Sequence, residues 1–477
     1  MKTIIHNAQI VNEGKVFPGS VVIEGDFITN VIDTAIADLS IYDQVIDGTG
    51  LYLLPGVIDS HVHFREPGMT HKADIASESR TAAAGGVTSY IDMPNCIPPT
   101  TTLQALEDKF KRGALNSRVN YSFFFGATNT NLSEIKQLDP HRVPGVKVFM
   151  GSSTGGMLVD EEWSLRDIFQ ESPLLLMCHC EDTQIIDQNI HDFKKRYKGQ
   201  NDFPVRYHSR IRSAEACYKS SSLAVRLAKE TGARLHIAHV STAEELNLFD
   251  TTKDIRQKRI TCEVVIPHLM FCTDDYDRLG CMIKCNPSVK TDVDREALRK
   301  ALTSGQIDVV STDHAPHLLS EKQGGALKAM SGMPMVQFSL VSMLELSDQG
   351  YLSVPRVVEL MCHNQALLFG IEGRGFIRKG YHADLVLVDP NANWQVISGR
   401  YYTKCGWTPM DERTFKWRVR RTIVNGKTAY CDGIVVDGVR GQEPDPLHRV
   451  FQGPGVDAKT NILKPADRLF VVPEIAG

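Results

Sequence analysis

Several features that would place this chain in a special class are missing from its sequence. No uninterrupted apolar run approaches ~20 residues, the length that a membrane-spanning helix needs. The formal net charge is only -4, with 53 basic and 57 acidic residues, so we expect neither nucleic acid nor a membrane as partner. Residues 1–6 are too polar to predict a secretory signal.

Cysteine is present, but without the spacing of a disulfide framework. The eleven cysteines are an odd number, and the close pairs Cys178 with Cys180 and Cys281 with Cys285 lie in apolar runs. Such thiols are typical of proteins in a reducing compartment, so we expect free structural cysteines and a cytoplasmic location. A zinc knuckle built on these pairs is the alternative.

The two ends of the chain have the pattern of β-structure. Residues 1–50 alternate short apolar and polar pieces separated by Gly and Asn, and the same pattern returns after residue 374. We therefore predict one composite β-sandwich domain built from residues 1–54 and 373–440. Residues 441–477 are rich in Pro, Gly and Asp and have no periodicity, which favours an extended tail.

Between these ends, residues 55–372 repeat one unit: a short apolar run, a polar tip and a helical stretch. The eight runs are residues 53–63, 87–95, 121–128, 146–150, 174–180, 235–240, 262–268 and 307–314. Eight such units predict an α/β fold, a (β/α)8 TIM barrel, with its reactive residues at the carboxyl ends of the strands. A doubly wound open sheet is the alternative, but no Gly-x-Gly-x-x-Gly follows the first run, which argues against nucleotide binding.

The tips of these runs carry side chains that can bind metal. His61 and His63 stand two residues apart at the end of a strand, so their side chains point to the same face. The other tips hold Asn95, Lys147, His179, His239, His268 and Asp313. Because the strand ends share one rim in a barrel, this nitrogen and oxygen set predicts zinc. The histidines exceed what one catalytic zinc needs, so we expect two zinc ions with an anionic bridge.

Lys147 is the candidate for that bridge. It stands inside the apolar run 146–150, where burial lowers the pKa of a lysine and favours the neutral amine. A neutral amine can add carbon dioxide and form a carbamate with two oxygens. A charged lysine that extends to the rim is the alternative, and Asp160 is the fallback bridge.

Longer motifs in this chain resemble the cyclic-amide hydrolases of the amidohydrolase superfamily, and among them the dihydroorotase family. The motifs are residues 55–68 (PGVIDSHVHFREPG), 92–95 (DMPN), 178–182 (CHCED), 236–242 (HIAHVST), 285–287 (CNP), 311–317 (STDHAPH) and 404–409 (KCGWTP). They extend from about residue 50 to 430 in the order found in that family. The resemblance implies a metal-dependent hydrolase with a barrel fold.

The resemblance also implies roles for single residues. The implied metal ligands are His61, His63, Lys147, His179, His239 and Asp313. Asp313 is also the implied catalytic acid and base. Many bacterial relatives use an aspartate as the bridge, whereas residues 146–150 here resemble the hydantoinase form with a carboxylated lysine.

The substrate residues follow from the tips that do not bind metal. Arg65 lies two residues beyond His63, and its planar guanidinium suits a carboxylate bound by two parallel hydrogen bonds. Asn95 can donate to the same carboxylate, and His317 can cover its far side. The resemblance adds substrate contacts at Asn286, Ser331 and Gly332. A salt bridge from Arg65 to Glu66 or Asp74 is the alternative for the arginine.

Dihydroorotate is a cyclic amide that bears a carboxylate, and its hydrolysis gives N-carbamoyl aspartate. We therefore expect these two compounds as the small-molecule partners. Allantoinase and dihydropyrimidinase (hydantoinase) chemistry is the first alternative. The second is an inactive scaffold subunit of a carbamoyltransferase, which should have lost ligands, whereas none is missing here. We also expect a homo-oligomer, either a dimer or a tetramer.

The segment that follows the eighth run is the candidate for a substrate cover. Residues 317–334 contain Gly324 with Gly325 and Ser331 with Gly332, which we expect to act as hinges. The next stretch, 331–337, departs from relatives, which more often have a Gly-rich loop followed by Glu.

Overall fold

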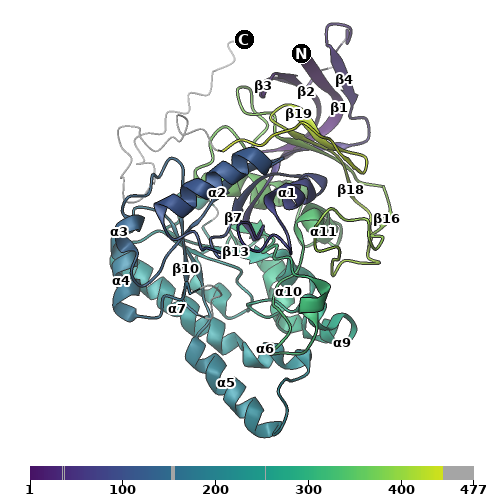
Figure 1. Ribbon diagram of the computed structural model, residues 1–477. Helices are drawn as coiled ribbons and strands as arrows, with labels where there is room; N and C mark the ends of the chain where they lie inside the picture. Colours follow the sequence, from purple (N-terminus) through teal and green to yellow (C-terminus); the bar gives the residue numbers. More distant parts are fainter. Residues whose placement is uncertain (35, 37, 152–155, 253, 444–477) are drawn as a thin grey trace.

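The computed structural model describes residues 1–34, 36, 38–151, 156–252 and 254–443 (Figure 1). Its centre is a ring of parallel strands, as the eight repeated units predict. The first three are β6 (Val57–Val62), β7 (Val87–Asp92) and β8 (Asn120–Phe123). The next six are β9 (Phe125–Gly126), β10 (Val146–Phe149), β11 (Leu176–His179), β12 (Leu235–Ile237), β13 (Ile260–Val265) and β14 (Val309–Ser311). β8 and β9 follow one another directly and occupy one position of the ring.

The ring is joined where its last strand meets its first. A parallel bridge pairs Val62 with His314, just beyond β14. The amide of His63 donates to the carbonyl of His314 at 2.7 Å, and the hydroxyls of Ser60 and Ser311 lie 2.9 Å apart. The predicted (β/α)8 barrel is confirmed. All residues of these strands except Ile260 are buried, as is usual where helices cover a parallel sheet.

Helices follow most strands and cover the outside of the barrel. The longer ones are α1 (Ile75–Ala84), α2 (Leu103–Asn116), α4 (Glu162–Glu171), α5 (Thr183–Arg196), α7 (Ala214–Thr231), α10 (Asp292–Ala301) and α11 (Ser339–Asp348). Shorter ones are α3 (Leu132–Ile135), α6 (His208–Ile211), α8 (Ile266–Met270), α9 (Tyr276–Leu279), α12 (Val354–Val358) and α13 (Asn364–Phe369). Local signals begin and end them: the Ser213 hydroxyl caps α7, and Gly232, at φ 78°, ends it.

One of the predicted strands ends earlier than expected. The run 262–268 is strand only as far as Val265, and α8 follows at once with Pro267 in its first turn. Proline suits the first turn of a helix because its missing N–H has no partner there anyway. His268 therefore lies on a helix and not at a strand tip.

Both ends of the chain build one further sheet, as their composition predicts. Within the described residues its strands run in the order β20-β19-β18-β15-β5-β1-β2-β3, and β4 pairs with β1 on the same edge as β5. From the amino end come β1 (Lys2–Asn12), β2 (Lys15–Glu24), β3 (Phe27–Ile32), β4 (Gln44–Asp47) and β5 (Tyr52–Pro55). From the carboxyl end come β15 (Leu385–Asp389), β18 (Arg418–Val424), β19 (Lys427–Cys431) and β20 (Ile434–Val435).

The two ends meet where β5 runs antiparallel to β15, with Leu54 opposite Val386. A separate small hairpin pairs β16 (Trp394–Gln395) with β17 (Thr414–Phe415). The domain boundaries predicted at 54/55 and 372/373 stay predictions, and the tail predicted for 441–477 lies almost wholly outside the described residues.

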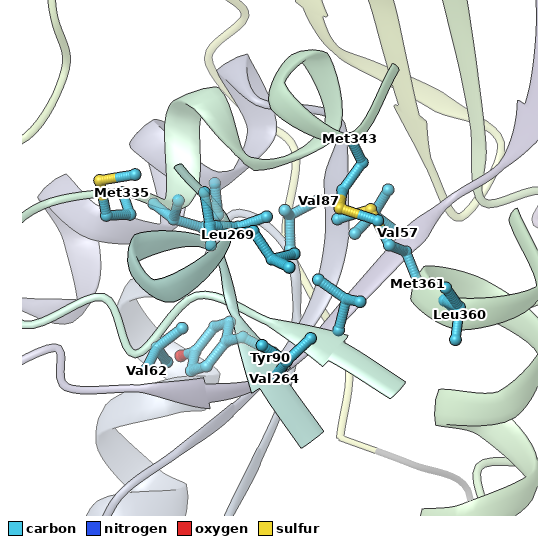
Figure 2. Packing of buried hydrophobic residues seen from close by; sticks show 14 of the residues in the cluster. Val57, Val62, Val87, Tyr90, Val264, Leu269, Met335, Met343, Leu360 and Met361 are labelled. Carbon is cyan, nitrogen blue, oxygen red and sulfur yellow. The ribbon is translucent and has the colours of Figure 1, made fainter. Parts of the chain in front are cut away.

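The hydrophobic core lies between the barrel and its helices. Figure 2 shows Val57, Val87 and Val264 from the strands facing Leu269 of α8 and Met343 of α11. Each apolar side chain of this size stabilises the fold by ~1.5–3 kcal/mol when buried. All eleven cysteines are free thiols, nine of them buried. Among the described helices we find none with the length and apolar character that crossing a membrane requires.

A buried ion pair joins the barrel to the terminal sheet. The Arg374 guanidinium pairs with Asp384, and both side chains are buried. Asp384 also accepts from Asn120 of β8 at 3.0 Å and from the backbone amide of Asn425 at 2.8 Å. One carboxylate thus connects a barrel strand with two segments of the carboxyl end.

We expect Arg374→Met to lower the free energy of unfolding by about 3–5 kcal/mol, because it leaves Asp384 buried without its counter-charge. Lys416→Met is the control: it removes an exposed cation, 3.4 Å from Asp348, whose loss should cost about 1 kcal/mol or less. Urea unfolding followed by circular dichroism measures both. Equal losses in the two variants would contradict the role of the junction.

Candidate active site

The predicted ligands lie at the carboxyl ends of the barrel strands. His61 is in β6, Lys147 in β10 and His179 at the end of β11. His239 lies two residues beyond β12 and Asp313 two residues beyond β14. The ring centroids of His61 and His239 are 5.3 Å apart, and those of His179 and His239 are 4.7 Å apart. The structure therefore brings these side chains together.

His61, His63 and Asp313 form the tightest group. The Nε2 atoms of His61 and His63 lie 3.5 Å and 3.1 Å from Oδ1 of Asp313. One ligand atom from each residue lies within 4.8 Å of the other two, a spacing that fits a shared metal ion.

His179 and His239 form a second pair of donors. Nδ1 of His179 lies 2.9 Å from Nε2 of His239, and both residues are buried. Nε2 of His179 is 3.0 Å from Glu181, so it is the Nδ1 lone pair that faces His239. Nε2 of His239 either donates a hydrogen to this lone pair or carries a lone pair of its own, and in the second form the two nitrogens can bind one metal ion.

Carboxylates and an amide hold these rings from behind, and the sequence analysis missed two of them. Glu263 of β13 contacts Nδ1 of His61, and Glu181 contacts His179 and also pairs with Arg212. A bond of this kind on the far nitrogen sets the tautomer and directs the other nitrogen inward. An acidic residue inside an apolar strand is the sequence feature that could have identified Glu263.

Asn95 performs the same task for His63. Its Oδ1 lies 2.8 Å from Nδ1 of His63, so Nε2 of that ring faces Asp313. Because Oδ1 of Asn95 is bonded to His63, only its NH2 group can make the predicted contact with the substrate.

The charges around Glu263 explain why a buried carboxylate is tolerated there. Burial alone would raise the pKa of Glu263, but His61 and His236 outweigh burial and hold the pKa below its ordinary value.

Burial lowers the pKa of His63 to about 4, although the Asp313 carboxylate opposes this. For Asp313 itself, His61 and His63 overcome burial and lower the pKa. Neutral imidazoles and an ionised carboxylate are the forms that bind metal.

Lys147 has the environment predicted for a carbamate bridge. It is 1% exposed, and its Nζ has no hydrogen-bond partner among the described residues. Burial lowers the pKa of Lys147, with Glu263 and Asp313 opposing. A buried ammonium without a partner is costly, so the neutral amine is favoured. By contrast, Asp160 is exposed and accepts from Asn129 at 3.0 Å.

Three residues of the site have the left-handed backbone conformation that favours glycine. They are Arg65 at φ 67°, His239 at φ 38° and Asp313 at φ 47°. Such conformations cost of order 1–3 kcal/mol each and cluster at functional sites. Each strained residue directs a predicted ligand or substrate-binding side chain.

Arg65 is buried beside the ligands and makes neither of the salt bridges considered for it. Glu66 pairs with Arg112 at 3.1 Å, and Asp74 pairs with Lys404 at 2.7 Å. The Nε of Arg65 donates to the carbonyl of Pro316 at 3.1 Å, and its Nη2 lies 3.0 Å from His317. The guanidinium thus retains donors for another acceptor.

The other predicted substrate residues lie on two neighbouring segments. The Ser331 carbonyl is 3.0 Å from Nε2 of His317. Gly332 packs so closely, at φ 133°, that a Cβ there would lie 2.6 Å from the Ala315 carbonyl oxygen. Asn286 is paired with His208 at 3.0 Å, on the segment that follows α9 and its short helical turn.

The segment 317–334 is tied down at several points. The buried ammonium of Lys322 donates to the carbonyls of Met330 and Gly332, both at 2.7 Å. Gly325 donates to Asp202 at 2.6 Å. One of the expected hinges is therefore held by hydrogen bonds, which argues for a fixed wall of the site and against a mobile cover.

The sequence pattern of the amidohydrolase family matches residues 52–429. This chain belongs to the amidohydrolase family. It is 36% identical to a dihydroorotase from Halobacterium salinarum, over 82% of this chain and 89% of the relative. It is also 32% identical to an allantoinase from Rubrobacter xylanophilus, over 84% of this chain and 88% of the relative. Among solved structures, L-hydantoinase from Arthrobacter aurescens matches with a TM-score of 0.85 and 27% identity, over 91% of this chain and 97% of that chain.

We expect Glu263→Gln to weaken metal binding about 10- to 100-fold, because the amide cannot hold His61 as firmly as a carboxylate does. Glu245→Gln is the control, since Glu245 is a buried carboxylate that bonds to Ser221 at 2.6 Å and to Thr242 at 3.0 Å. Metal content after dialysis against a graded chelator measures the effect. Equal retention by both variants would show that Glu263 does not support the ligand.

Proposed function

We propose that this protein catalyses the reversible hydrolysis of L-dihydroorotate to N-carbamoyl-L-aspartate, a step of pyrimidine synthesis. The observation that carries the proposal is the buried pair Arg65 and His317 beside the ligand cluster, where a substrate carboxylate would bind. The Halobacterium salinarum relative, at 36% identity, and one from Methanosarcina mazei, at 34%, are both named dihydroorotase, which supports it.

The ligand set supports two zinc ions. In this proposal they are held by His61, His63, His179, His239, Asp313 and a carbamate on Lys147. The inward lone pairs of the histidines and the unpartnered buried amine of Lys147 fit such a site. When bound, zinc polarises a carbonyl and lowers the pKa of water, so that hydroxide forms near neutral pH.

Asp313 is the group that moves the proton. Its lowered pKa keeps it ionised, so its carboxylate can accept the proton of the attacking water. It then donates this proton to the amide nitrogen that leaves the ring carbonyl. Ring closure uses the same two transfers in reverse order.

The substrate is oriented by its carboxylate. The Arg65 guanidinium, the NH2 group of Asn95 and the His317 ring supply donors to it, and the backbone at Ser331 and Gly332 borders the ring. Asn286 completes this set of proposed contacts. Charge-assisted hydrogen bonds of this kind select substrates that carry the carboxylate.

Allantoinase and dihydropyrimidinase are the competing activities, since a curated relative and a solved neighbour carry such names. Both act on cyclic amides, and dihydrouracil, the ring used to test dihydropyrimidinase activity, has no carboxylate for Arg65. An inactive scaffold is disfavoured because every predicted ligand is present. The free thiols support the proposed cytoplasmic location. The homo-oligomer, a dimer or tetramer, stays a prediction.

We expect Lys147→Ala to lose metal and activity together, because both ions share the proposed bridge. Short carboxylic acids should restore part of the turnover by filling the gap. Asp160→Ala, which removes the fallback carboxylate, should keep both metals and full activity. Metal analysis combined with the dihydroorotate assay tests this prediction. If Lys147→Ala retained two metals, another residue would have to be the bridge.

The deciding experiment assays the purified protein on dihydroorotate, allantoin and dihydrouracil, with Arg65→Met beside the wild type. We expect dihydroorotate to be the best substrate. Its kcat/KM should fall about 10- to 100-fold in Arg65→Met, while the rate on dihydrouracil changes far less. Arg112→Met removes a nearby cation bound to Glu66 and should leave both rates intact. Preference for allantoin, or an equal fall on both rings, would refute the assignment.

A further inference from the structure

Lys72 is a buried cation near the substrate residues that the sequence analysis did not single out. It lies between β6 and α1 and is 6% exposed. Its Nζ is 3.1 Å from Nδ1 of His317 and 2.7 Å from Oε1 of Glu321. The lysine therefore connects an acidic partner to the histidine proposed to face the substrate.

These contacts determine which nitrogen of His317 carries the proton. An ammonium group has three N–H donors and no acceptor, so Nδ1 of His317 must accept from Lys72. The two oxygens of Glu321 are directed to other donors, Oε1 to Lys72 and Oε2 to the Leu318 amide at 2.8 Å. Oε2 itself lies 3.7 Å from Nδ1, beyond hydrogen-bond distance. The ring hydrogen is therefore on Nε2.

The Nε2–H group faces the substrate side of the ring. It lies 3.0 Å from the Ser331 carbonyl and 3.0 Å from Nη2 of Arg65. The single hydrogen on Nε2 is donated to the Ser331 carbonyl, and the Arg65 N–H groups lie beside it. A substrate carboxylate bound here would accept from Arg65 and share the Nε2 hydrogen with Ser331. A carboxylate with two oxygens is the acceptor that matches this arrangement.

The surroundings of His317 also keep the ring neutral. Burial, followed by the charges of Arg65, Lys72 and Lys322, lowers the pKa of His317 far below its ordinary value. A neutral imidazole has one donor and one acceptor, so its orientation and tautomer decide whether it attracts or repels an anion.

We propose that Lys72 is a positioning residue that holds His317 as a neutral Nε2–H donor for the substrate carboxylate. This inference rests on the proposed function for the identity of the substrate. Without Lys72, the hydrogen is free to move to Nδ1, and the Nε2 lone pair then faces the carboxylate and repels it. Glu321 completes the arrangement by balancing the charge of Lys72.

The first test reads the tautomer directly, without any turnover. Nitrogen NMR of protein labelled with 15N-histidine distinguishes a protonated Nε2 from a protonated Nδ1, and His317→Asn identifies the signal by its loss. We expect the wild type to have the hydrogen on Nε2 and Lys72→Met to have a mixture of tautomers. A wild-type ring protonated on Nδ1 would overturn the proposal, whatever the variants do.

The second test separates substrate binding from chemistry. Lys72→Met should raise KM for dihydroorotate by about tenfold or more, with kcat changed by less than about threefold, because one charge-assisted bond to the substrate is lost. Lys72→Arg keeps a donor and should recover much of the affinity. Lys404→Met, which removes a nearby cation paired with Asp74 at 2.7 Å, should leave KM unchanged.

The outcomes distinguish this proposal from the proposed function. A wild type inactive on dihydroorotate would refute the function and leave the tautomer measurement valid. Equal KM values for Lys72→Met and the wild type would refute the positioning role, as would an equal rise in Lys404→Met. Should Lys72→Met fail to fold, the nitrogen NMR measurement on the wild type, which needs no variant of Lys72, still tests the proposal.

Discussion

The site depends on one constraint: every ionisable group buried at the strand ends needs a partner behind it. Glu263 supports His61, Asn95 supports His63 and Glu181 supports His179. These partners fix the orientation of each ring and direct its other nitrogen inward. Burial lowers the pKa of His179 and favours the neutral ring, although the Glu181 carboxylate opposes this. Among the described residues, two of the predicted ligands depart from this rule, because Nδ1 of His239 and Nζ of Lys147 have no hydrogen-bond partner. For Lys147, whose amine would be charged in water, this is the reason to expect a modification.

The same constraint extends to the substrate side. Arg65, His317 and Lys72 are three basic side chains buried close together, and Glu321 supplies carboxylate to only one of them. A substrate carboxylate would supply the charge that Arg65 lacks. The segment 317–334 is held by hydrogen bonds from Lys322 to the carbonyls of Met330 and Gly332, and its backbone borders this group of positive charges. In the proposed function, selectivity for an acidic ring would arise from the same packing that builds the wall of the site.

Much of the architecture could be predicted from the sequence because it follows from local patterns. The eight apolar runs predicted the barrel strands. The alternation of apolar and polar residues at both ends predicted the sheet that the two ends share. The prediction of a strand over residues 262–268 was wrong beyond Val265, because a helix with Pro267 in its first turn begins there. The predicted ligands were selected because they stand within or at the ends of apolar runs, and the structure places His61, His63 and Asp313 close together.

The sequence by itself determined the chemical kinds of side chain, their place at strand ends and the resemblance to cyclic-amide hydrolases. Only the tertiary structure decided how these groups are paired. Glu263 is 202 residues from His61, and Lys72 is 245 residues from His317, so no spacing along the chain could connect them. The tautomer of a histidine depends on which atom lies 3 Å from each nitrogen. That distance is set by the closure of the barrel and by its loops, because folding alone brings such distant residues into contact.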